Sequence, residues 1–165
     1  MEFLAKLHPE AVHFPIAFLL AYALLEILGT ILKKEFLSKT AHLFLLLGVL
    51  GLIAAVITGN QAQEIAHNLS KKGVSVSFKA INEHEEFANI TLWYFTALLA
   101  LRTMAVIKKR FIGIIKYSFI VLALMGAFLV YETAGHGGTL VYKHGIGTDL
   151  KEMKINPSNP GSGGE

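Results

Sequence analysis

The sequence contains no cysteine, and only 16% of its 165 residues are charged. Without cysteine the chain cannot form disulfides, thiolate zinc or iron–sulfur sites, or the thioether links of c-type haem. Any bound metal must therefore be held by histidine, carboxylate or carbonyl oxygen. Apolar residues make up 53% of the chain and the mean hydropathy is +0.53, which is more than a soluble domain of this size can bury. These values indicate an integral membrane protein.

Four apolar stretches reach the roughly 20 residues that a membrane-spanning helix needs. They are Val12–Leu32, Ala41–Gly59, Phe87–Ile107 and Gly113–Ala134. The predicted fold is all-α, a four-transmembrane-helix bundle over residues 1–150 with a disordered tail at 151–165. Between the second and third spans, Asn60–Glu86 is too long for a simple turn. We expect a structured outer loop there, with a short helix at Gln61–Ser70 and an extended segment at Val74–Phe78.

Basic residues cluster in the two short connections between spans. They are Lys33, Lys34, Lys39, Lys108, Lys109 and Arg110. Short basic loops of membrane proteins stay in the cytoplasm, so both termini and the central loop are predicted to lie outside. Beyond these loops the chain has no dense basic patch, and nucleic-acid binding is not expected.

With this topology, six of the seven histidines lie on the outer side of the membrane. The outer ones are His8, His13, His67, His84, His136 and His144, and His42 is the inner one. Cofactors in four-helix bundles are held between helices by inward side chains, so His13, His84 and His144 are candidate ligands. Pro15 removes a backbone hydrogen bond and can bend the first span so that His13 turns inward. For His42, His67 and His136, interfacial or loop roles are favoured.

Two charged residues fall inside the apolar spans, Glu26 in the first and Arg102 in the third. Both lie five or six residues from the inner end of their span, and hence at similar depth. A charge inside a membrane is costly and is usually paired or functional. An ion pair with His42 nearby is the simplest interpretation, and the inner end of a proton path is an alternative.

Motifs of self-contained catalysis are missing. His84-Glu85-Glu86 begins like the His-Glu-x-x-His zinc motif, but position 88 is alanine. The chain has no phosphate-binding glycine loop and no evident pair of nucleophile and base. An electron carrier or redox subunit is therefore expected rather than a self-contained enzyme.

Several motifs together resemble those of the DUF2231 family of bacterial four-helix integral membrane proteins. They are Leu7–Ala17, Ala54–Gly59, His84 with Ala88-Asn89, and Gly137–Gly145, and they cover nearly all of the chain before the tail. The resemblance implies a multi-pass protein of the bacterial inner membrane, similar in architecture to small bis-histidine b-type cytochromes. It also implies histidines at the positions of His8, His13, His84 and His144, and it leaves His136 at a lower rank.

The leading hypothesis is a membrane electron-transfer protein that binds one or two non-covalent b-type haems on the outer side. His13 and His84 are the first candidates for axial ligands, since bis-histidine ligation needs two imidazoles across one iron. His8 and His144 then form a second pair or support the first. The predicted electron partner is a quinone or a periplasmic redox protein.

Two alternatives remain open. The same four histidines, with His136 at lower rank, suit a copper- or zinc-binding or transport module, because imidazole binds both metals. The chain also suits a structural subunit of a respiratory membrane complex, or a homo-oligomer, because nothing in its sequence excludes either.

Overall fold

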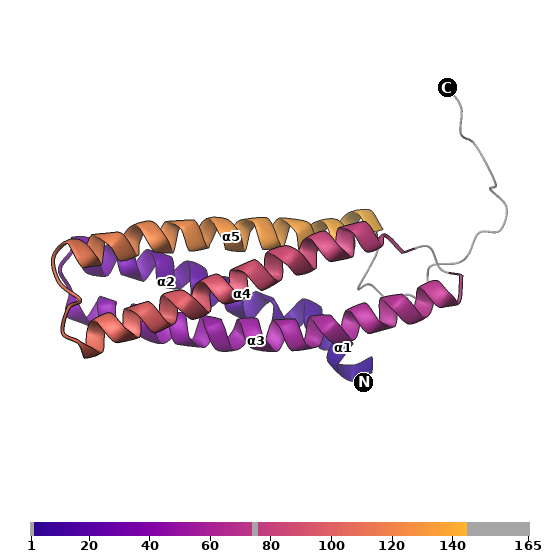
Figure 1. The fold of residues 1–165 in the computed structure, drawn as a ribbon, viewed down its shortest axis with the longest axis horizontal. Helices are drawn as coiled ribbons and strands as arrows, with labels where there is room; N and C mark the ends of the chain where they lie inside the picture. Colours follow the sequence, from indigo (N-terminus) through magenta and orange to yellow (C-terminus); the bar gives the residue numbers. More distant parts are fainter. Residues whose placement is uncertain (1, 74–75, 145–165) are drawn as a thin grey trace, which may run out of the picture.

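The structure is a computed structural model that describes residues 2–73 and 76–144, with the side chains of Glu2 and His144 left undescribed. The described residues form five helices and no strand. They are α1 (Glu2–Ala11), α2 (His13–Ile31), α3 (Glu35–Lys71), α4 (Phe78–Ile107) and α5 (Ile114–His144). All five run along one long axis, as Figure 1 shows. The prediction of an all-α protein is confirmed.

Four helical stretches are long and apolar enough to cross a membrane. They are Phe3–Ile31, which joins α1 and α2, Glu35–Lys71, Phe78–Ile107 and Ile114–Lys143. The first span is interrupted at Val12, a single residue in a turn that separates α1 from α2. Pro15 lies one turn further on and has no N–H to give to the carbonyl of Ala11, which accounts for the weakened helix at this point.

The segment predicted as a long central loop, Asn60–Glu86, is mostly helical: the predicted helix at Gln61–Ser70 is present, as the last part of α3. Helix α3 continues to Lys71 and α4 begins at Phe78, so only residues 72–77 connect them. Helix α3 ends where Gly73 adopts a positive φ of 87°, a common way to stop a helix. Of the predicted extended segment, Val74 and Ser75 lie outside the described residues, as does the tail predicted to be disordered.

The fourth span is also longer than predicted. Helix α5 passes Ala134 and continues to His144, so the glycine-rich segment 135–138 is helical. Hydropathy marks the part of a helix that meets lipid, whereas the helix itself continues until a residue breaks it. Glycine inside a helix is tolerated at a modest cost, which neighbouring packing offsets here.

The helices form a bundle in which α2 packs against α3 and α5, and α4 packs against the same two helices. Helices α2 and α4 are therefore diagonal to each other, and α1 extends the first span along α3. One end of the bundle carries the basic loops 32–34 and 108–113, and we call it the basic end (left in Figure 1). The opposite end carries His8, His84 and His136, and we call it the histidine end.

Large apolar side chains fill the centre of the bundle, among them Leu19, Leu45 and Phe95, each 0% exposed. A smaller apolar cluster of Ala66, Ile81 and Leu140 lies at the histidine end. The outward faces expose many large apolar side chains, such as Trp93 and Phe128, as expected of surfaces that contact lipid.

Close helix packing depends on glycine, which predicts a clear effect of substitution on α5. A Cβ atom on Gly126 would lie 2.6 Å from Phe95, whereas one on Gly135 would meet nothing within 4 Å. We expect Gly126→Ala to lower the free energy of unfolding by about 1–3 kcal/mol, and Gly135→Ala to leave it unchanged or slightly raised. Unfolding of both variants in mixed micelles measures this. Equal stability of the two variants would contradict the packing described here.

Candidate functional site

The structure brings together two histidines at the histidine end, His8 on α1 and His84 on α4. Their ring centroids are 6.5 Å apart and the ring planes make an angle of 68°. The pair bridges the first span and its diagonal partner α4, so it lies within the bundle. Ile81 is one turn before His84, and it belongs to the small apolar cluster at the histidine end.

The ring of His8 is held in one orientation by Thr58 on α3. His8 Nδ1 lies 3.0 Å from Thr58 Oγ1, and that hydroxyl also lies 3.0 Å from the carbonyl oxygens of Ala54 and Ala55. A hydroxyl has a single hydrogen, so when Thr58 donates it to its own helix, its oxygen accepts from Nδ1–H of His8. His8 Nε2 then keeps its lone pair, the arrangement in which imidazole binds a metal.

The ring of His84 has a buried nitrogen without a partner. Among the described residues, nothing forms a hydrogen bond with His84 Nδ1. A buried polar atom without a partner costs free energy, and most such atoms in proteins are bound to something. The two neighbouring imidazoles therefore differ: His8 Nδ1 is bonded to Thr58, whereas His84 Nδ1 has no partner among the described residues.

Glycines on the neighbouring helices make room for both rings. A Cβ atom on Gly59 of α3 would lie 3.1 Å from His8 Cε1, and one on Gly137 of α5 would lie 3.1 Å from His84 Cε1. Each imidazole is thus packed against the backbone of an adjacent helix. A larger residue in place of the glycine would displace the imidazole.

The other predicted histidines lie elsewhere. His13 is exposed on the surface of the bundle, so the structure places His8, and not His13, beside His84. His136 stacks on Phe87, with ring centroids 4.4 Å apart, and its Nδ1 lies 2.9 Å from the carbonyl of Glu132. His67 is exposed and stacks on Phe78. The side chain of His144 lies outside the described residues.

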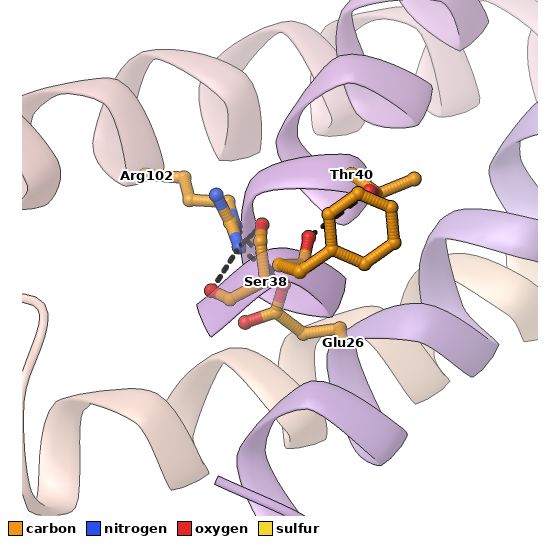
Figure 2. A network of polar contacts seen from close by, with 5 residues as sticks. Glu26, Ser38, Thr40 and Arg102 are labelled. Atoms are coloured by element: carbon orange, nitrogen blue, oxygen red, sulfur yellow. Dashed lines mark hydrogen bonds and ion pairs between the residues drawn. The ribbon is translucent and has the colours of Figure 1, made fainter. Parts of the chain in front are cut away.

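A second polar site lies towards the basic end, where Glu26 and Arg102 form the predicted ion pair (Figure 2). Glu26 Oε2 accepts hydrogen bonds from Arg102 Nε at 3.0 Å and Nη2 at 2.7 Å. Arg102 Nη2 also donates to the carbonyl of Ser38 at 2.9 Å and contacts its hydroxyl at 3.2 Å. Both charged side chains are 1% exposed, so the ion pair is a buried link between α2 and α4.

The two polar sites share one helical register. His84 precedes Arg102 by 18 residues, as His8 precedes Glu26. Eighteen residues make about five turns of α-helix, so the members of each pair lie on one face. The sequence therefore contains a signal for His8 that spacing between histidines alone does not reveal. His13 does not share it, because its 13-residue separation from Glu26 is about 3.6 turns.

The described part of the chain holds no group of three or more histidine, aspartate and glutamate side chains placed to bind a metal ion. Four membrane-length helices define the chain as a multi-pass helical membrane protein. A family model described as "Predicted membrane protein (DUF2231)" matches residues 5–150, and the chain belongs to this family. Among curated proteins and among solved structures, no match was found.

The buried ion pair predicts strong non-additivity between its two residues. Arg102→Leu leaves the Glu26 carboxylate without its partner in the bundle interior, and we expect a loss of about 3–5 kcal/mol in unfolding free energy. In the double variant Glu26→Leu/Arg102→Leu no charge remains buried, so most of this stability should return. A double-mutant cycle by unfolding in mixed micelles measures the coupling. Additive losses in the double variant would show that the two side chains act independently.

Proposed function

We propose that this protein is a membrane electron-transfer protein that binds non-covalent b-type haem, and that His8 and His84 are the residues that would hold it. The observation that carries the proposal is the imidazole pair inside the bundle, each ring with a nitrogen available. It revises the choice of ligands made from sequence, because His13 points away from the bundle interior.

The separation of the rings fits two ligands of one iron. Imidazole nitrogen binds first-row metals at about 2.0–2.1 Å, so two imidazoles on opposite sides of a metal have ring centres roughly 6–6.5 Å apart. The observed separation is 6.5 Å.

Haem suits a two-histidine site better than copper or zinc does. A closed copper or zinc site needs three or four protein ligands, and the described residues hold no such group. The haem macrocycle supplies four nitrogen ligands to its iron, so the protein supplies only one or two. When bound, its iron supplies one-electron redox chemistry.

The residues of the chain have definite tasks in this proposal. Thr58 fixes the tautomer and orientation of His8, and Gly59 and Gly137 let the two imidazoles approach the helix backbones. The apolar cluster that contains Ile81 lies next to His84 along α4, and low polarity around haem tunes its redox potential.

We further propose that the histidine end faces the periplasm, across a bacterial inner membrane, because the basic loops occupy the opposite end. This orientation places the imidazole pair near the outer membrane surface. A quinone or a periplasmic redox protein would then be within reach as electron partner.

The haem proposal predicts a specific pattern among three histidine variants. Purified protein, expressed with ample haem supply, should show a Soret band and a reduction-dependent α band. We expect His8→Ala and His84→Ala each to lose most of the bound haem, because each removes an axial ligand. The matched control His13→Ala should keep both bands, since its side chain is exposed.

Three results would contradict this assignment. Absence of both bands in the wild-type protein rules out the cytochrome proposal. Loss of haem in His13→Ala but not in His8→Ala returns the ligand role to His13. Stoichiometric copper or zinc without haem, measured in the same sample, favours the metal-binding alternative, and an empty sample favours a structural subunit.

The orientation is tested separately with single cysteines, for which the cysteine-free chain gives no background. Lys72→Cys, between α3 and α4, should react with a membrane-impermeant maleimide added outside intact spheroplasts. Lys34→Cys, between α2 and α3, should react only after the membrane is opened. The reverse pattern would place the histidine end in the cytoplasm.

A further inference from the structure

In the ion pair at the basic end, one carboxylate oxygen of Glu26 has no hydrogen-bond partner among the described residues. Arg102 directs both hydrogen bonds to Glu26 Oε2, and Glu26 Oε1 is buried with no hydrogen bond to any described residue. One turn earlier on α2, Tyr22 is 0% exposed, and its hydroxyl also has no partner among the described residues. These two atoms lie on the same face of one helix, at successive turns.

Helix α3 contributes a third such atom beside the same guanidinium. Ser38 accepts a hydrogen bond from Arg102, and His42 lies one turn further along α3. The Nδ1 atom of His42 is buried and, within the described ranges, has no hydrogen-bond partner. We call Tyr22, Glu26, Ser38, His42 and Arg102 the basic-end cluster.

Three unpartnered polar atoms around one buried guanidinium indicate that water is bound there. Each atom left alone costs free energy, whereas a buried water satisfies two to four such groups at once. Cations are a poor alternative, because the cluster has a single carboxylate and it already neutralises Arg102.

We propose that the basic-end cluster encloses bound water and takes up a proton from the aqueous phase at the basic end, with Glu26 as the acceptor. A hydronium ion gives its proton to Oε1 of the Glu26 carboxylate, which becomes a neutral carboxyl group, and a water molecule remains. Arg102 has a second partner in the Ser38 carbonyl, which is independent of the charge on Glu26. This inference goes beyond the proposed electron transfer and does not rest on it.

The cluster is close to the aqueous phase at the basic end. Phe111, in the loop between α4 and α5, covers Arg102, with Arg102 Cζ 4.6 Å from the ring centroid. Lys116 Nζ lies 5.6 Å from the same ring. The buried guanidinium and a lysine of the basic end thus contact the same aromatic ring.

The titratable and charged groups around Glu26 come from every packed helix. They are Tyr22 on α2, His42 on α3, Tyr94 and Arg102 on α4, and Lys116 on α5. Among the described residues, Glu35 is a second carboxylate at the basic end, but it is exposed and paired with Lys39, so a signal from a buried carboxyl group in this region belongs to Glu26.

Infrared spectroscopy of the full-length protein, titrated in H₂O and D₂O, tests the proposal. We expect a band from a buried, protonated carboxyl group that grows as the pH falls and shifts in D₂O. Glu26→Gln should lose this band, and the exposed control Glu10→Gln should keep it. If wild-type and Glu26→Gln spectra coincide at every pH at which the helices persist, Glu26 is a permanent ion-pair partner and the proposal is wrong.

A second variant tests the bound water without touching the ion pair, in case Glu26→Gln does not fold. Tyr22→Phe removes the hydroxyl that shares the water, so the Glu26 carboxyl band should shift in frequency. The control Tyr117→Phe, at a residue 55% exposed, should leave the band in place. An unchanged band in Tyr22→Phe would overturn the hydrated site. Neither measurement requires haem, so failure of the haem proposal does not affect them.

Discussion

Lipid provides no hydrophobic force that draws one apolar helix onto another, so this bundle depends on close packing and on polar links between spans. The Glu26–Arg102 ion pair is a polar link between α2 and α4, which lie diagonally and otherwise meet through apolar side chains of the core. Each charge is buried and depends on the other for compensation. The pair therefore fixes the rotation of both helices about their axes, and with it the side chains that face the interior.

The imidazole pair follows from that rotation. Once Glu26 and Arg102 face each other, residues about five turns away on the same faces must also face each other, and these are His8 and His84. His13 lies roughly 220° around the first span from Glu26 and faces outward. The similar depth of the two charges was enough to predict the ion pair. The same register also predicts the histidine pair, whereas histidine spacing and a proline bend favour the wrong side of the helix.

Helix length could not be predicted from the apolar runs, because hydropathy records contact with lipid and not helical geometry. Helix α3 carries polar residues from Asn60 to Lys71 and still has no breaker until Gly73. Helix α5 passes through three glycines at 135–138, where Gly137 packs against His84. Of the glycines that suggest a loop in the sequence, Gly137 serves close packing in the fold and Gly135 meets nothing, and only the position of the opposite side chain distinguishes the two.

The two polar sites are far enough apart to act almost independently. Five turns of helix separate them by about 27 Å along the axis, and the apolar core of Leu19, Leu45 and Phe95 lies between them. At an effective dielectric constant of about 20, unit charges at that distance interact by roughly 0.6 kcal/mol. An electron at the imidazole pair would thus change proton affinity at Glu26 only about threefold. Stronger coupling would require a movement of α4, the one helix that carries a member of each pair.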